Sequence, residues 1–293
     1  MARVAAILER APPLAARART EAVRDVDEAR AVVQRLLPNE LPVAAGGDGT
    51  VTLVAHALRS AGIGQRPFAV LPTGTGHAFA AAIGVRSAAD ALAAIDFGEP
   101  RPLDVMVTTH REAPLALVSI SAGFEPRMLA TIGASPHWRR APRVLRAMAH
   151  MPVRSSTGIA ITLDGTPLVT AAERTYNAGL YNLPYYGFRW LMWPDADGAD
   201  GVAEGVACLS WWSYWRTLFT GLRTAQLTHR PALRAQRWRR AHLDVVGPVQ
   251  IDGEVVDGGA FDVVVEPRAM QVLCPPGGTS PTAPPPPPPA RSP

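Results

Sequence analysis

Residues 41–58 read LPVAAGGDGTVTLVAHAL, and this stretch sets the architecture of the first part of the chain. Leu41 to Ala45 is a short apolar run that predicts a buried strand. Gly46-Gly47-Asp48-Gly49-Thr50 follows as a turn, and apolar residues then recur at helical spacing at Val51, Val54, Ala55 and Leu58. The chain is therefore expected to pass from a strand, through a glycine turn, directly into a helix.

The residues of this turn suit a phosphate group. Glycine lets the backbone turn tightly and approach a ligand closely. The start of a helix offers unpaired N–H groups and the positive end of the helix dipole. In this position the carboxylate of Asp48 can act with Mg²⁺ or bond a nucleotide hydroxyl. It can also serve only as a helix cap, and the turn alone leaves both interpretations open.

A second turn of the same kind follows the apolar run from Phe68 to Leu71. It reads Pro72-Thr73-Gly74-Thr75-Gly76 and again stands between a predicted strand and a predicted helix. If the two strands are neighbours in one parallel sheet, both turns face the crevice at their carboxyl ends, where open α/β sheets bind ligands. The pair predicts a nucleotide site much more specifically than either turn, with these contacts: Gly46, Gly47, Asp48, Gly49, Thr50, Thr73, Gly74, Thr75 and Gly76.

The chain as a whole divides into a region of alternating strands and helices, a region of short strands and a tail. Up to about Pro102, strands alternate with helices, including a strand at Val4–Leu8, a helix within 19–37 and a helix from Ser87 that begins with a capping box. Later segments are short strands with turns at Asp164-Gly165 and Asp252-Gly253, interrupted by helices near 139–150 and 211–224.

These patterns predict a doubly wound α/β domain over residues 1–103, with 266–274 as a candidate segment that completes it. They predict an antiparallel, β-sandwich-like domain over 104–265. The last residues, 275–293, are proline-rich and are expected to be disordered or to form polyproline II.

Composition narrows the function classes. All 29 basic residues are arginines, the formal net charge is +4 and the sequence pI is about 9.6. This excess suits phosphates or anionic lipid heads but is too small to indicate nucleic-acid binding. Cys208 and Cys274 are far apart and give no disulfide or metal-ligand pattern, which favours a reduced, cytoplasmic setting. No apolar run reaches the ~18 residues needed to span a bilayer, so membrane contact is expected to be peripheral.

Taken together, the motifs resemble the diacylglycerol kinase catalytic-domain family, which includes bacterial soluble lipid kinases. Members carry a GGDGT loop, a P-x-GTxNDFA loop and a β-rich second domain. The resemblance covers roughly residues 40–274. Further similar elements follow the two loops: Arg101-Pro-Leu-Asp104, Ser121-Ala-Gly-Phe124, Tyr185-Tyr-Gly187, Pro194-Asp-Ala196, Asp200-Gly201-Val202 and Val249-Gln-Ile-Asp-Gly-Glu254.

The resemblance implies an ATP-dependent lipid kinase that moves the γ-phosphate to the hydroxyl of a diacylglycerol-like or sphingoid-like lipid, with Mg²⁺ as cofactor. It implies that Glu254 is the general base, that Asp48 takes part in catalysis and that Asp200 helps to hold the metal ion. Such a reaction needs a group that accepts the hydroxyl proton. From the residues alone, an ordinary hairpin residue in solvent is the better interpretation of Glu254, and only the resemblance reverses it. Asp200 is equally an ordinary loop acid.

Three stretches depart from the family pattern. No N-P-x-S-G loop follows Val4–Leu8, the pair His77-Ala78 stands where members have Asn-Asp, and Phe188–Trp193 replaces a run of glycines. A catalytically degenerate module that binds lipid or nucleotide is therefore an alternative. An NAD kinase is a further one, but its Asn-Glu pair lies downstream of GGDGT, whereas Asn39-Glu40 lies upstream.

Two segments carry tryptophan beside arginine. One is a basic helix with Trp138, Arg139, Arg140, Arg143 and Arg146. The other is an apolar stripe of Trp211, Trp215, Leu218 and Leu222 flanked by Arg216 and Arg223. A solvated basic face and a core-facing helix are the ordinary interpretations, and a surface that meets anionic lipid is the alternative. The oligomeric state is left open.

Overall fold

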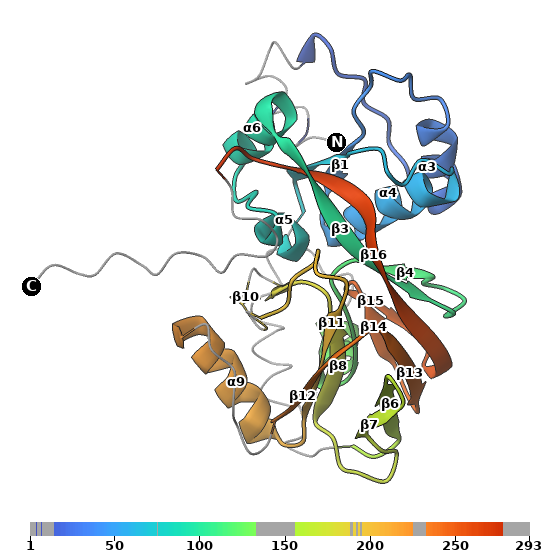
Figure 1. Ribbon diagram of the computed structural model, residues 1–293, viewed down its shortest axis with the longest axis vertical. Coiled ribbons are helices and arrows are strands. Elements are labelled where there is room, and N and C mark those ends of the chain that lie inside the picture. Colours follow the sequence, from blue (N-terminus) through green and yellow to red (C-terminus); the bar gives the residue numbers. More distant parts are fainter. Residues whose placement is uncertain are drawn as a thin grey trace, which may run out of the picture.

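The computed structural model describes residues 4, 7, 15–74, 76–132, 156–187, 190–191, 193, 195–224 and 233–277 of the chain. Figure 1 shows an α/β part and a β part joined by two long strands that lie side by side, β3 (Glu99–Thr108) and β16 (Gly259–Cys274). The two strands pair antiparallel, with an irregularity between Glu266 and Met270. This ladder, interrupted at that irregularity, connects the two parts of the molecule.

The α/β part is built on two parallel strands, β1 (Val43–Gly46) and β2 (Ala69–Pro72). A single parallel bridge from Phe68 to Val272 links this pair to β16. Four helices follow or flank these strands: α3 (Val26–Val33), α4 (Asp48–Ser60), α5 (Ala78–Ala82) and α6 (Ala88–Phe97). Met270 and Val272 of β16 are fully buried in the same core, so the end of the chain packs into the α/β part.

Local signals explain where the helices begin. The side chain of Asp25 accepts a hydrogen bond from Glu28 N and starts α3. Ser87 and Asp90 form the predicted capping box of α6. The helix predicted within 19–37 is shorter than the pattern suggested, because Asp25 caps it late and the chain must leave the helix before Pro38, whose ring disfavours a helical residue in front of it.

The predicted strand at Val4–Leu8 is wrong at its two described positions. Val4 and Ile7 both have helical backbone. A short apolar run cannot by itself distinguish a strand from a buried helical segment. The alanines, leucine, arginine and glutamate around these positions are strong helix formers, and here local preference agrees with the observed state.

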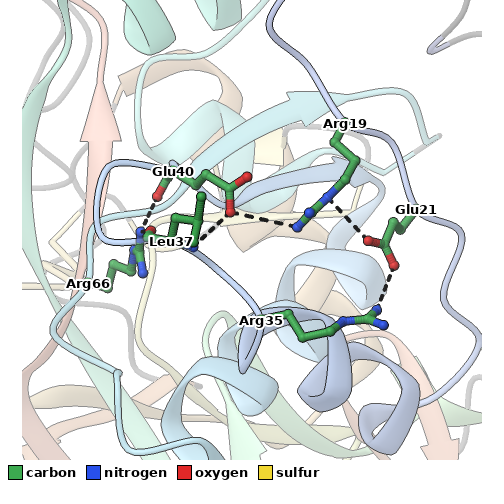
Figure 2. Close-up of polar contacts among 6 residues, drawn as sticks. All are labelled: Arg19, Glu21, Arg35, Leu37, Glu40 and Arg66. Carbon is green, nitrogen blue, oxygen red and sulfur yellow. Dashed lines mark hydrogen bonds and ion pairs between the residues drawn. The ribbon is translucent and has the colours of Figure 1, made fainter.

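The approach to β1 is held by a set of exposed polar contacts, shown in Figure 2. Arg19 bridges Glu21 and Glu40 at 3.3 and 3.7 Å, and Arg35 binds Glu21 at 3.0 Å. Arg66 donates to the carbonyl oxygens of Leu37 and Glu40. Exposed ion pairs are worth only about 0–1 kcal/mol each, so these contacts order the segment more than they stabilise it.

The β part consists of two six-stranded sheets in which all pairs are antiparallel. One sheet has the order β12-β11-β8-β5-β14-β15 and the other β4-β3-β16-β13-β6-β7. Their remaining strands are β4 (Leu115–Ala116), β5 (Ser119–Gly123), β6 (Ile159–Leu163), β7 (Thr166–Val169), β8 (Asn177–Tyr181), β11 (Ala203–Cys208), β12 (Leu233–Trp238), β13 (Arg240–Val245), β14 (Val249–Ile251) and β15 (Glu254–Val256).

Side chains from both sheets form one buried cluster, with Ile120 and Leu180 from the first and Ile161, Leu243 and Val263 from the second. This arrangement confirms the predicted sandwich. The two predicted turns are confirmed as well, since Asp164-Gly165 and Asp252-Gly253 each have positive φ at both residues and connect paired strands.

A third cluster of aromatic side chains packs outside the first sheet, under α7 (Phe124–Ile132) and α9 (Trp211–Thr224). A small ribbon of β9 (Tyr185–Tyr186) and β10 (Trp190–Leu191) lies beside them. Trp215 is buried in this cluster, so the core-facing interpretation of the α9 stripe is confirmed for that residue, whereas Trp212 is 73% exposed. The helix predicted near 139–150 and most of the tail lie outside the described residues.

Candidate functional site

The two glycine turns meet at the carboxyl ends of β1 and β2. The carbonyl oxygen of Gly46 accepts hydrogen bonds from Thr73 N at 3.0 Å and Gly74 N at 3.1 Å. A Cβ on Gly74 would lie 2.4 Å from the Cα of Gly47, which is closer than real Cβ contacts allow. Glycine is therefore required at position 74, and the two turns form one continuous surface.

The start of α4 is open to an anion. Its N-cap is Gly47, which makes no side-chain capping bond. A Cβ on Gly46 would lie 2.2 Å from the Thr50 hydroxyl oxygen, so glycine there lets the helix begin immediately after β1. Unpaired N–H groups at a helix start and the positive end of the helix dipole favour a phosphate at this position.

Asp48 connects the two turns. Its carboxylate accepts hydrogen bonds from Ala78 N at 3.1 Å and Phe79 N at 3.0 Å, at the start of α5. Asp48 therefore acts as a helix cap, which is one of the two roles expected from the sequence. It caps the neighbouring helix α5 and not its own helix α4. Because the donors are backbone groups, the change to His77-Ala78 leaves this connection in place.

Glu254 lies beside the start of α4. The position of a Cβ on Gly49 is 3.4 Å from Oε1 of Glu254, and the side chain is exposed. Within the described part of the chain, no hydrogen bond or ion pair engages its carboxylate. The fold thus brings a carboxylate that has no other described partner to the first glycine turn. Of the predicted site residues, the glycines, Asp48, Thr50, Thr73 and Glu254 come together, and Thr75 lies outside the described residues.

The turn that carries Glu254 is firmly held by Asp252. Its buried carboxylate accepts hydrogen bonds from the backbone N–H groups of Leu117, Val118 and Ser119 at 2.7, 2.8 and 3.0 Å. It also accepts one from the hydroxyl of Thr52 on α4 at 2.7 Å. Burial raises the pKa of Asp252, and these hydrogen bonds oppose that rise.

Sequence reasoning missed this role of Asp252 and Thr52. It treated Asp252 only as a turn residue and did not consider Thr52. The available signal was weak: a hydroxyl four residues after Asp48, on the same face of the predicted helix. Nothing in the local pattern shows which residue such a hydroxyl will meet.

Asp200 belongs to a different region. Its carboxylate pairs with Arg237 and accepts from Val202 N at 3.1 Å. Arg237 also binds Glu204 at 3.2 Å. Within the described part of the chain, no three His, Cys, Asp or Glu side chains are grouped so that they could hold a metal ion. Asp200 as a magnesium ligand stays a prediction.

Several acids crowd around Asp200. Asp104 is buried and accepts from Gly201 N at 2.6 Å and Arg268 N at 2.7 Å, which joins this region to β16. Burial is the main cause that raises the pKa of Asp104 and of Asp197, and Asp200 adds repulsion. Burial also raises the pKa of Glu204 to about 7, against the opposing effect of Arg237. These acids act mainly as structural connections.

One more buried acid lies in the aromatic cluster. The carboxylate of Glu125 accepts hydrogen bonds from the hydroxyls of Tyr181 at 3.2 Å and Tyr214 at 3.0 Å. Burial raises the pKa of Glu125, and these hydroxyls oppose the rise. Its contacts are all within the β part, so Glu125 holds α7 and α9 onto the sheet and does not reach the glycine turns.

Comparison with known proteins now gives this site a context. Residues 2–108 match the family model of the diacylglycerol kinase catalytic domain. The matched segment contains both glycine turns, α4, α5 and Asp104. The resemblance to the diacylglycerol kinase catalytic-domain family is thereby confirmed, and the kinase class is supported. No curated protein matches the chain at a significant level.

Solved structures confirm the two-part fold. A candidate diacylglycerol kinase from Bacillus anthracis str. Sterne superposes with a TM-score of 0.75 and 19% identity, over 94% of this chain and 93% of that chain. A diacylglycerol kinase structure from the same organism gives a TM-score of 0.65 and 17% identity, over 88% of this chain and 85% of that chain. Both the diacylglycerol kinase fold and its two-part plan therefore extend over nearly the whole chain.

Proposed function

We propose that this protein is a lipid kinase that transfers the γ-phosphate of ATP to the hydroxyl group of a lipid alcohol. The observation that carries the proposal is the position of Glu254, whose carboxylate lies beside Gly49 at the open start of α4. Phosphoryl transfer needs a phosphate site and a proton acceptor next to each other. The match to the diacylglycerol kinase catalytic domain supports the same class of reaction.

In the proposed reaction, the N–H groups at the start of α4 and the joined glycine turns hold the phosphates of ATP. Glu254 takes the proton from the lipid hydroxyl while the oxygen attacks the γ-phosphorus. The new O–P bond forms, the bond from the γ-phosphorus to the bridging oxygen breaks, and ADP leaves. Asp48 keeps the two turns in register and places a second negative charge near the phosphates.

That charge supports a role for Mg²⁺ as the cofactor. Triphosphate oxygens beside Asp48 and Glu254 would repel both carboxylates without a cation. Magnesium commonly keeps several waters and binds through one or two carboxylates together with substrate phosphates. Asp48 fits this donor set, because each of its oxygens accepts one described hydrogen bond and retains a further lone pair. Asp200 is the second candidate ligand, and it would have to leave Arg237 at least in part.

The experiment that tests the proposal is a transfer assay with the full chain, labelled ATP and a panel of lipid alcohols. The panel contains diacylglycerol, a sphingoid base, a ceramide and a polyprenol-like alcohol, each in mixed micelles. ATP-dependent label in at least one lipid supports a lipid kinase and names its acceptor. ATP binding without label in any lipid would instead favour the degenerate binding module. NAD is tested as a separate acceptor, and label in NAD would favour an NAD kinase.

We also propose that the protein contacts membranes peripherally. No helix within the described residues is long and apolar enough to cross a bilayer. On α9, Trp212 is 73% exposed and Arg216, one turn later, is exposed as well. An aromatic side chain beside a cation suits the interface of an anionic bilayer.

Vesicle flotation tests this contact. Binding to vesicles that contain anionic lipid should exceed binding to neutral vesicles and should fall as salt rises, because each basic residue near the surface adds about 1 kcal/mol that salt screens. Trp212→Ala should weaken binding to anionic vesicles, with Phe97→Ala as the control for loss of another exposed aromatic side chain. Equal binding to both vesicle types at every salt concentration would contradict the electrostatic part.

A further inference from the structure

The hydroxyl of Thr52 forms a hydrogen bond between the helix of the first glycine turn and the turn that carries Glu254. Thr52 Oγ1 lies 2.7 Å from Oδ2 of Asp252, a residue 200 positions later in the chain. The second acceptor of this hydroxyl, the carbonyl oxygen of Asp48, is farther away at 3.2 Å. A hydroxyl has only one proton to donate. The carboxylate of Asp252 is the nearer and stronger acceptor, so the hydroxyl of Thr52 donates to it.

The other bonds of Asp252 all lead to the β part. Its carboxylate binds three successive N–H groups at residues 117–119, and its own N–H donates to Ser119 O at 2.9 Å. Gln250 adds to the same anchor, since its side chain accepts from Gly253 N at 2.7 Å and donates to Ser119 Oγ at 2.9 Å. These bonds fix the shape of the turn, but they do not fix its distance from α4.

Within the described residues, two contacts at the turn itself bear on that distance, beside the apolar packing that α4 shares with Leu115 of β4. Thr52 meets Asp252, and Gly49, one turn earlier on the same face of α4, lies beside Glu254. The Gly49 contact cannot hold the carboxylate in place, because glycine offers no side chain. Within the described residues, the hydroxyl of Thr52 is therefore the group on α4 that positions the turn by a directional bond.

We propose that Thr52 is a positioning residue for the phosphoryl transfer: through Asp252 it holds Glu254 at the phosphate end of α4. This inference rests on the proposed function, in which Glu254 accepts the lipid proton. A positioned base loses much of its effect when it shifts by about 1 Å, which can cost up to 10²-fold in rate. Loss of the Thr52 hydroxyl should therefore act on turnover and leave the nucleotide site largely unchanged.

The test compares Thr52→Val, which keeps the shape and removes the hydroxyl, with Thr52→Ser, which keeps the hydroxyl. Thr52→Val should lower kcat by about 10–100-fold with the KM for ATP changed by less than about 3-fold, and Thr52→Ser should keep most of kcat. The matched control is Thr131→Val on α7, because Thr131 makes the same kind of bond to the carbonyl four residues earlier, at 2.8 Å, but is exposed. This control should leave kcat unchanged.

A double variant separates positioning from general stability. In a Glu254→Gln background, Thr52→Val should cause no further loss of kcat, because the base that it positions is already absent. An additive loss would overturn the inference, and so would a folded Thr52→Val with full kcat. If Thr52→Val does not fold, Thr52→Ala is measured in the same way, and unchanged kcat in that variant also overturns it. Absence of lipid transfer by the unmodified protein would overturn the proposed function instead, and this inference with it.

Discussion

Two groups of carboxylates in this protein look alike in the sequence and differ in their surroundings. At the glycine turns, Asp48 and Asp252 are bound by backbone N–H groups, and Glu254 is left exposed beside the start of α4. In the region of Asp200, each acid whose contacts are described is bound by an arginine or by backbone N–H groups. A carboxylate accepts a proton in a reaction most readily when ion pairs and hydrogen bonds leave its oxygens free. The exposed carboxylate that can accept a proton therefore lies in the first region, and the acids of the second region mainly connect segments of the chain.

The strongest test of the comparison removes the acid that joins the two glycine turns. Asp48→Ala should abolish phosphoryl transfer, because the turns lose the side-chain connection between them and the phosphate site loses its carboxylate. Two buried N–H groups would lose their acceptor, so we expect a loss of about 1–3 kcal/mol in unfolding free energy as well. Transfer assays and urea unfolding measure the two effects.

The matched control for this variant is Asp90→Ala. Asp90 also accepts backbone N–H groups at a helix start, from Arg86 and Ser87 at 2.9 and 2.8 Å, but it lies on α6 away from the turns. The Asp90→Ala protein should be less stable to urea but should keep the turnover of the unmodified protein. Full turnover in a folded Asp48→Ala protein would remove this loop from the active site.

The next test concerns the exposed acid itself. Glu254→Gln keeps size and shape but cannot accept the lipid proton, so kcat should fall by about 10²–10⁴-fold while ATP binding stays near normal. Steady-state kinetics with varied ATP give both quantities. The control is Glu204→Gln in the second region, which should keep kcat. Loss of ATP affinity with unchanged kcat would place Glu254 in the nucleotide site instead.

Glu204 gives a test of the second region by pH. Its pKa in the folded protein is raised from the ordinary 4.5 to about 7, mainly by burial. The folded state therefore retains a proton that the unfolded state releases, so stability should fall as pH rises from about 4.5 to about 7. The fall should reach at most about 3 kcal/mol.

Urea unfolding at pH 5 and pH 8 measures this difference, and Glu204→Gln should reduce it because glutamine does not ionise. If the variant kept the full pH dependence, another group would be responsible. The expected effect on phosphoryl transfer is small, which distinguishes Glu204 from Glu254.

The last test measures the contact of the two turns through stability alone. A Cβ on Gly74 would lie 2.4 Å from the backbone of Gly47, whereas a Cβ on Gly47 would meet nothing closer than 3.5 Å. Gly74→Ala should therefore cost about 1–3 kcal/mol of stability, as overpacking usually does. Gly47→Ala, the control from the opposite side of the same contact, should cost about 1 kcal/mol or less. Thermal unfolding of both variants is the measurement, and equal losses would show that the turns do not pack as described.

The sequence predicted much of this architecture, because the relevant signals are local. A glycine turn between an apolar run and a helical pattern gave β1 and α4, and Ser87 with Asp90 gave the start of α6. Asp164-Gly165 and Asp252-Gly253 gave two hairpin turns, since those pairs accept positive φ. The strand expected at Val4 and Ile7 was wrong, because a short apolar run indicates burial but does not distinguish a strand from a helix.

Residue types in the chain predicted a phosphate site and a sandwich that follows it, and the family resemblance added Glu254 as the acid beside that site. Their partners depended on packing between segments far apart in sequence. Asp48 caps α5 and not its own helix, Thr52 meets Asp252 across 200 positions, and Asp200 pairs with Arg237. A turn or a cap forms between neighbours, so its residues predict it. A contact between two distant side chains depends on how β3 and β16 join the two parts of the molecule. The residues next to each side chain in the sequence do not show which distant residue it will meet.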